Sequence, residues 1–168
     1  SSLSTSEIKT EWNGATFSST KTLAENLKDL NGFSFLNMFL KDESLNNALA
    51  SEEMVTIFVP SDEAFMKLSE TKRDSLLANK DKIASTIKFL TIPGRLDLAS
   101  IKTILRQNDR VMYLATLSGE KLGVKLLGEE IILFDSENNT AVLSATNFYH
   151  KNGLFHFVSG LVFPSTVK

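Results

Sequence analysis

The chain contains 168 residues, of which 42% are hydrophobic and 23% charged, so its length favours one domain whose core folds without disulfides or a structural metal. The 18 basic and 20 acidic side chains give a net charge of −2. This charge argues against nucleic acid and anionic membranes as charge-driven partners. The absence of cysteine excludes disulfides, thiolate zinc sites and cysteine nucleophiles, but it does not identify the cellular compartment.

The first residues are polar and rich in serine and threonine, and we predict that residues 1–21 form an N-terminal leader segment. Its large apolar side chains, Ile8, Trp12 and Phe17, are expected to pack onto the domain that follows. Such a start is typical both of a processed secreted or anchored protein and of an expression boundary. The most apolar stretch, residues 155–163, is about half the length of a membrane-spanning helix, so no span is expected in the mature chain.

Helical signals begin directly after this leader. Thr22 and Glu25 have the spacing of a capping box, in which the hydroxyl and the carboxylate accept hydrogen bonds from the first free amides of a helix. Asn-Gly at residues 31–32 predicts the end of that helix. Apolar residues at helical spacing then predict two more short helices, within residues 35–40 and 45–49.

A β-branched and aromatic run at residues 55–59 predicts a buried strand that ends at Pro60. Residues 61–63 then combine a hydroxyl with two carboxylates, which is typical of a helix N-terminus because its free amides and its dipole favour oxygen acceptors and negative charge. Further helices are predicted over residues 83–90 and 97–105.

The hydrophobic period changes to two after Arg110, as expected for strands. The predicted strands are residues 111–117, 122–127, 131–134, 140–143 and 154–158. Turn-forming residues separate them and favour antiparallel pairing. Helices followed by a β meander predict an α+β domain rather than a doubly wound α/β one, with the early strand joining the later sheet across a long stretch of chain.

Two segments of the chain resemble the signature boxes of fasciclin-like domains. Residues 56–65 are similar to the first box, residues 152–164 to the second, and residues 92–96 to the central turn of the family. The family-motif residues, expected to be mainly structural, are Thr56, Phe58, Pro60, Ser61, Asp62, Phe65, Asn152, Gly153, His156 and Pro164.

This resemblance extends over residues 22–164 and implies a fold and a domain organisation. The implied fold is α+β, with N-terminal helices packed on a wedge of two mostly antiparallel β-sheets. The predicted organisation is a leader over residues 1–21, a fasciclin-like domain over residues 22–164 and a tail over residues 165–168.

The sequence departs from the family at positions linked to receptor contact. Many members carry Tyr-His just before the central turn, where this chain has Phe89 and Leu90, and residues 142–144 offer no carboxylate ahead of the second box. These departures argue against animal-type integrin recognition. Tyr149 and His150 form a Tyr-His pair, but they lie in an apparent insertion beside the second box.

Candidate partner-binding residues follow from this comparison with the family pattern. They are Phe89, Leu90, Arg95, Tyr149 and His150. Leu90 also completes an apolar helical stripe and is expected in the core, which leaves Phe89 as the better candidate for an exposed apolar docking patch.

The sequence predicts no catalytic residue, no metal site and no cofactor. It has only 2 histidines, no cysteine and no hydrolase or metalloprotease motif. His156 lies between two phenylalanines in a predicted strand, where a buried histidine with hydrogen-bond partners is a better interpretation than a ligand or base. Asp62 is expected to serve a helix terminus and its dipole rather than a substrate. Residues 135–139 lack the glycine and glutamate pattern of a calcium loop and predict a turn.

The resemblance implies a non-enzymatic extracellular or cell-surface adhesion module that binds a cell-surface or matrix protein or a glycan, with avidity gained through repeated display. In a bacterium the corresponding location is the periplasm or an outer-membrane anchor. The alternative is an envelope-associated module that binds a small molecule or a polysaccharide. A sizeable apolar pocket with converging polar groups favours the alternative, whereas a flat surface with a modest patch favours adhesion.

Overall fold

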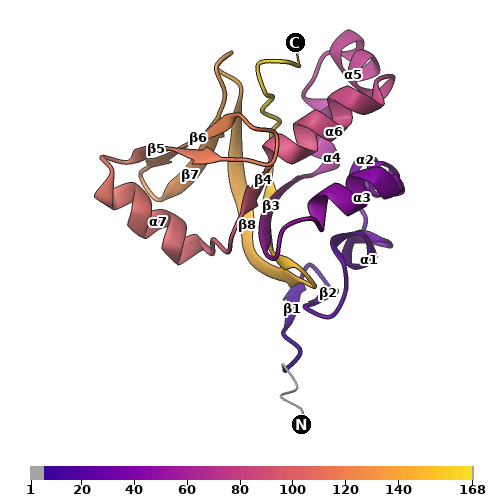
Figure 1. Cartoon of the computed structure of the whole chain (residues 1–168), viewed down its shortest axis with the longest axis horizontal. Helices are drawn as coiled ribbons and strands as arrows, with labels where there is room; N and C mark the ends of the chain where they lie inside the picture. The colour runs from indigo at the N-terminus through magenta and orange to yellow at the C-terminus, as the bar shows by residue number, and fades with distance from the viewer. Residues whose placement is uncertain (1–5, 168) are drawn as a thin grey trace.

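The computed structural model describes residues 6–167, so residues 1–5 of the predicted leader and Lys168 of the predicted tail lie outside the described residues. The described residues form helices packed on a seven-stranded sheet, together with a two-stranded antiparallel hairpin (Figure 1). This arrangement confirms the predicted α+β class.

The bounds of the elements follow chain order. The strands are β1 (Lys9–Trp12), β2 (Ala15–Ser18), β3 (Val55–Pro60), β4 (Thr91–Pro93), β5 (Val111–Ala115), β6 (Lys121–Leu127), β7 (Glu130–Phe134), β8 (Thr140–His150) and β9 (Gly153–Val158). The helices are α1 (Leu23–Leu27), α2 (Ser34–Phe39), α3 (Glu43–Leu49), α4 (Asp62–Met66), α5 (Glu70–Leu77), α6 (Lys80–Phe89) and α7 (Leu98–Gln107).

The large sheet has the strand order β4-β3-β9-β8-β7-β6-β5. β3 lies parallel to β9 and antiparallel to β4, so the early strand joins the later sheet as predicted. β8 belongs to both halves of the sheet, because its first residues pair with β7 and the remainder with β9. Register shifts between Leu143 and Phe148 mark the transition, and such irregularities bend a strand. β8 therefore links the two parts of the wedge, as its long curve in Figure 1 shows.

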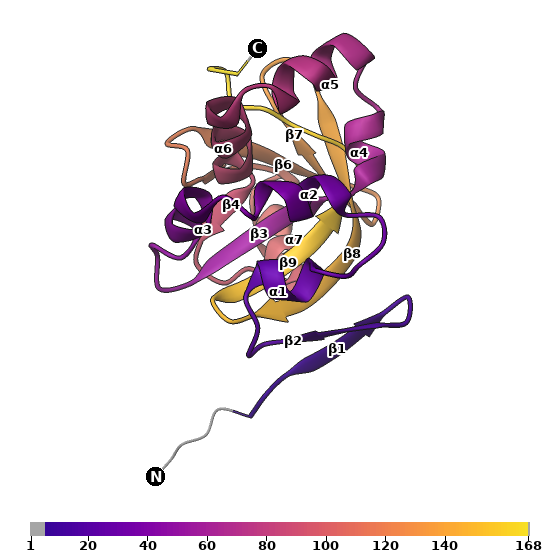
Figure 2. The same ribbon diagram turned by 90° about the vertical axis from the view of Figure 1, so that its right-hand side faces the viewer.

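A cluster of aromatic rings joins the N-terminal elements to this sheet. Figure 2 shows α1 and α2 in front of β9 and β3, with the hairpin of β1 and β2 at one end. The clustered rings belong to Trp12, Phe17, Phe33, Phe148, Phe155 and Phe157. Full burial of one such phenylalanine contributes about 1.5–3 kcal/mol, so this cluster supplies the cohesion that small cysteine-free domains need.

Residues 9–18 form a β-hairpin within the predicted leader segment, residues 1–21. Its two-residue turn is Asn13-Gly14, and both residues have positive φ, 47° and 81°, which is the conformation that a type I′ hairpin turn requires. Phe17 is fully buried, and the Trp12 ring lies 4.7 Å from the Phe157 ring centroid to centroid. The expected packing of large apolar side chains thus takes place through a regular element.

Asp62 caps a different helix from the one that it begins. Its carboxylate accepts hydrogen bonds from the amides of Ser34 (3.1 Å) and Phe35 (3.0 Å) and from the Ser34 hydroxyl (2.7 Å). These groups lie at the start of α2, whose own N-cap residue, Phe33, has no side-chain acceptor. Ser61 stands at the N-cap of α4 without a side-chain capping bond. Asp62 therefore lies in the first turn of α4, as predicted, but the helix start that its carboxylate caps is that of α2, so the residue connects the two helices.

Candidate functional site

Thr56 of the first box holds the central turn in place. Its hydroxyl donates to the carbonyl of Gly94 at 3.0 Å and accepts from the amide of Leu96 at 2.9 Å. Thr56 is fully buried, so both bonds form away from water, where an unpaired partner is costly. The first box therefore fixes the loop that begins directly after β4.

His156 of the second box binds the same turn from the other side. Its Nε2 donates to the carbonyl of Leu96 at 2.8 Å, and its Nδ1 accepts from the amide of Asn147 at 3.0 Å. The ring is fully buried and stacks on Phe58, with centroids 5.7 Å apart. Burial lowers its pKa, which matches a neutral ring with one donor and one acceptor nitrogen. Both ring nitrogens bind backbone groups, so His156 connects β9 to the central turn and to β8.

The turn between β8 and β9 fastens the second box to β3. The Asn152 side-chain amide donates to the carbonyls of Leu49 (3.3 Å) and Glu52 (3.2 Å), and the Asn152 carbonyl accepts from the amide of Val55 (2.9 Å). Gly153 follows with φ of 139° and lies directly beside the backbone of Val55. Asn152 and Gly153 thus close the parallel pairing of β3 with β9.

The remaining motif residues contribute apolar contact. Phe65 packs its ring on Phe35 and Phe39, at centroid distances of 4.9 Å and 5.6 Å. Phe58, Pro60 and Pro164 are also buried. Most family-motif residues are therefore buried and make contacts within the domain, whereas Ser61, Asp62 and Asn152 are half-buried.

Three of the five candidate partner-binding residues are buried, which corrects the proposed surface position of Phe89 and His150 and confirms the core position expected for Leu90. Phe89 is 2% exposed, Leu90 0% and His150 6%. Phe89 and Leu90 lie where α6 passes directly into β4. The sheet therefore covers Phe89, although the helical periodicity of the sequence places this residue on the exposed side of the helix. His150 pairs with Gly153 inside the hairpin of β8 and β9 and does not belong to a surface insertion.

Arg95 and Tyr149 are the two candidates that reach the surface. The Arg95 guanidinium carbon lies 5.5 Å from the centroid of the half-buried Tyr149 ring, within the range of a cation–π contact. Arg95 lies within the central turn, between Gly94 and Leu96, whose backbone groups Thr56 binds. Arg95 and Tyr149 therefore form a small patch at this turn.

Stability is expected to fall as the pH drops from 7 to 5, because the folded domain holds His150 neutral. Burial lowers its pKa to about 4, whereas an unfolded histidine titrates near 6.5. The unfolded chain therefore binds the additional proton, so stabilisation is fully present above pH 6.5 and is lost progressively toward pH 4. We expect a loss of about 2 kcal/mol by pH 5. Urea denaturation at both pH values checks this, and an equally steep loss in His150→Gln would contradict it.

The outer face of β5, β6 and β7 carries the densest group of exposed large apolar side chains. We define the outer sheet face by Val111, Tyr113, Lys121, Lys125, Leu127 and Phe134. Tyr113 is 60% exposed, Leu127 64% and Val111 43%. The strand register places these side chains together, since Val111 lies opposite Lys125 and Tyr113 opposite Gly123. The inward residues of the same strands, such as Leu122 and Val124, are fully buried.

Contacts within the outer sheet face fix its aromatic residues. The Tyr113 ring meets the Phe134 ring edge-on at 5.7 Å, and the Lys125 ammonium lies 5.4 Å from the Phe134 centroid. Phe134 lies over Gly123, where a β-carbon would come within 2.4 Å of the ring. The face therefore combines apolar side chains with charged ones of both signs, since Glu130 lies opposite Leu127. Alternation in residues 111–115 and 121–127 predicts strands with one open face, but none of these residues belongs to a motif that predicts a binding site.

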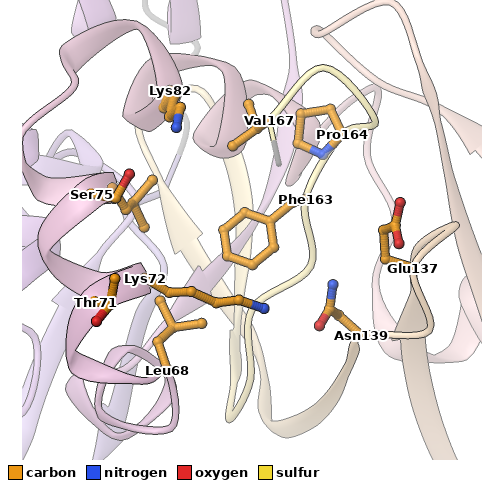
Figure 3. A pocket seen from close by; sticks show the side chains of 11 residues that line it. Leu68, Thr71, Lys72, Ser75, Lys82, Glu137, Asn139, Phe163, Pro164 and Val167 are labelled. Carbon is orange, nitrogen blue, oxygen red and sulfur yellow. The ribbon is translucent and has the colours of Figure 1, made fainter.

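A cleft of about 450 Å³ opens between α5, α6 and the C-terminal segment. It is lined by Leu68, Thr71, Lys72, Ser75, Leu76, Lys82, Glu137, Asn139, Phe163, Pro164 and Val167. Figure 3 shows the Phe163 ring at the centre of the cleft, with the α5 side chains on one wall and Asn139 and Glu137 on the other. Its volume lies within the range of about 300–1,000 Å³ that is usual for small-molecule sites.

No group of three or more metal-ligating side chains occurs among residues 6–167. His150 and His156 both use their ring nitrogens for backbone groups. Asp135 accepts from the amides of Glu137, Asn139 and Phe163, as expected of a turn. None of the helices within residues 6–167 has the length and apolar character to cross a membrane.

The fold and its motif residues define an α+β module of the fasciclin type, and comparisons with known proteins agree. The Fasciclin domain family matches residues 31–164. Protein sll1483 of Synechocystis sp. is 30% identical over 134 residues, covering 79% of this chain and 67% of that protein. Transforming growth factor-beta-induced protein ig-h3 of Sus scrofa is 27% identical, covering 88% of this chain and 20% of that protein. The chain belongs to the fasciclin domain family.

A solved structure shows the same fold at low sequence identity. A FAS1 domain pair from the insect cell adhesion molecule Fasciclin I matches with a TM-score of 0.70 and 13% identity, covering 88% of this chain and 52% of that chain.

Human periostin is a further sequence relative, 23% identical, with 86% of this chain and 16% of that protein covered. The chain therefore spans a fifth or less of ig-h3 and periostin.

Proposed function

We propose that this domain is a non-enzymatic adhesion module, placed outside the cell or at its surface, that binds a cell-surface or matrix protein. Membership of the fasciclin family supports adhesion, since a domain pair of this fold comes from an insect cell adhesion molecule. In a bacterial host we place the module in the periplasm or on the outer membrane.

The outer sheet face is the observation that carries this proposal. It groups Tyr113, Leu127 and Val111, each more than 40% exposed, and such a grouping on a folded domain is typical of an interaction surface. Charges of both signs lie on this face, because Glu130 stands opposite Leu127 beside Lys121 and Lys125, so its complement is a protein patch with an apolar centre and a polar rim.

Multivalent display tests the proposal, because a single weak module gains retention through avidity. Beads that carry many copies of the folded domain are expected to adhere to cells or matrix from the source organism and to lose adhesion when soluble domain is added in excess. Beads that adhere no better than beads carrying an unrelated folded domain would contradict the proposal.

The cleft beside α5 favours a second candidate function, the binding of a small molecule or a polysaccharide. It combines an apolar ring, hydroxyl groups and two lysines in one depression, which is the combination of features that such a site requires. The cleft and the outer sheet face share no residue, so the two functions are separable by mutation.

A further inference from the structure

We propose that the cleft between α5, α6 and the C-terminal segment binds an acidic saccharide, with its pyranose rings against Phe163 and its carboxylates on Lys72 and Lys82. This inference rests on the second candidate function proposed for the cleft and concerns a different surface from the one proposed for adhesion. Its basis is the aromatic ring at the centre of the cleft, the hydroxyl groups on one wall and the two lysines that line it.

Phe163 supplies the apolar part of this site. Its ring is half-buried and stands at the centre of the cleft in Figure 3. The Phe163 amide donates to the buried Asp135 carboxylate at 2.8 Å, which fixes the backbone that carries the ring. An accessible aromatic face of this kind offers flat apolar contact, and it suits the C–H face of a sugar ring.

Polar groups of the right kind surround that ring. Thr71 and Ser75 lie one turn apart on α5 and line the same wall, and their hydroxyls both donate and accept hydrogen bonds as sugar hydroxyls require. On the opposite wall the Asn139 side chain donates to Asp135 at 2.9 Å, so its orientation is set. A hydrocarbon chain would leave the hydroxyls of Thr71 and Ser75 without partners, whereas sugar hydroxyls form hydrogen bonds with them.

The two lysines give the site its charge preference. Neither Lys72 nor Lys82 takes part in an ion pair formed within residues 6–167. Figure 3 shows Lys72 extending beneath the Phe163 ring toward Asn139, with Lys82 on the α6 side of the cleft. Lysines at separate points along a cleft match a saccharide with more than one carboxylate.

Titration of the whole chain with trimers of galacturonate and of mannuronate tests the proposal, with neutral galactotriose and octanoate as comparison ligands. At least one acidic trimer is expected to bind at least about tenfold more tightly than either comparison ligand. Lys72→Gln with Lys82→Gln is expected to weaken that binding by about tenfold. Both side chains are solvent-accessible, so the double variant keeps its fold. Amide NMR shifts are expected at Thr71, Ser75 and Asn139.

Lys121→Gln with Lys125→Gln is the matched control, because it removes the same charge from the outer sheet face. An equal loss in this control would show non-specific attraction and overturn the proposal. So would equal affinity for galactotriose, tighter binding of octanoate, or no binding of either acidic trimer. Bead adhesion is expected to be unchanged in the cleft variant, so failure of this site and failure of the adhesion surface give different results.

Discussion

Gly153→Ala is expected to destabilise the domain by about 4 kcal/mol, which is a large share of the roughly 5–15 kcal/mol that keeps a typical domain folded. A β-carbon at residue 153 would lie 2.0 Å from the Val55 carbonyl oxygen, and the backbone has a φ of 139° that side chains rarely adopt. The clash is with backbone of the neighbouring strand, so only a shift of β3 against β9 relieves it. Urea denaturation with linear extrapolation gives the change in unfolding free energy.

Gly119→Ala is the matched control for that experiment. Gly119 also has positive φ, 90°, but an added β-carbon there has no heavy atom within 4 Å. Its cost is therefore the backbone strain alone, about 1–2 kcal/mol. If the two variants lost the same stability, the close approach of β3 and β9 at the second box would not be the reason for glycine at residue 153.

His156→Leu is expected to lower the unfolding free energy by about 3 kcal/mol and to leave the surface binding of the folded protein unchanged. Leucine fills the space but leaves the amide of Asn147 and the carbonyl of Leu96 without their partner nitrogens. Each buried group left unsatisfied costs about 1–3 kcal/mol. Thermal denaturation and bead adhesion of the same preparation measure both quantities.

His156→Gln separates the hydrogen bonds from the packing. Its side-chain amide retains a donor for Leu96 and is expected to recover part of the loss. Lost adhesion at unchanged stability, in either variant, would instead assign His156 to the binding surface.

The sequence was sufficient for the fold class and for the second half of the sheet, because short amphipathic periods and turn residues are local signals. The hairpin of residues 9–18 was not predicted, because the serine- and threonine-rich composition suggested an irregular leader. The Asn13-Gly14 pair is nevertheless a sequence signal for a two-residue hairpin turn. β8 was predicted only to residue 143 because register shifts interrupt its alternation beyond that point. Local patterns also do not show that Asp62 reaches α2 across 28 positions.

The candidate site was harder to predict than the fold, because exposure depends on which elements cover which. Phe89 has the sequence environment of a surface residue, and β4 and the sheet bury it. Tyr113 alternates with inward residues in β5, but the sequence does not show which face of that strand remains open. The cleft depends on residues from α5, α6, the turn before β8 and the chain beyond β9. No single segment contains a motif for it.

The outer sheet face is tested most directly by the adhesion of beads that display single-surface variants. Tyr113→Ser with Leu127→Ser is expected to reduce adhesion about tenfold or more, because truncating an exposed aromatic anchor removes much of a binding energy. Met38→Ser with Met66→Ser, which are 49% and 59% exposed on other elements, and Arg95→Ala beside the central turn are expected to adhere as the wild type does. Wild-type adhesion by the Tyr113 and Leu127 variant, with its stability intact, would contradict the account.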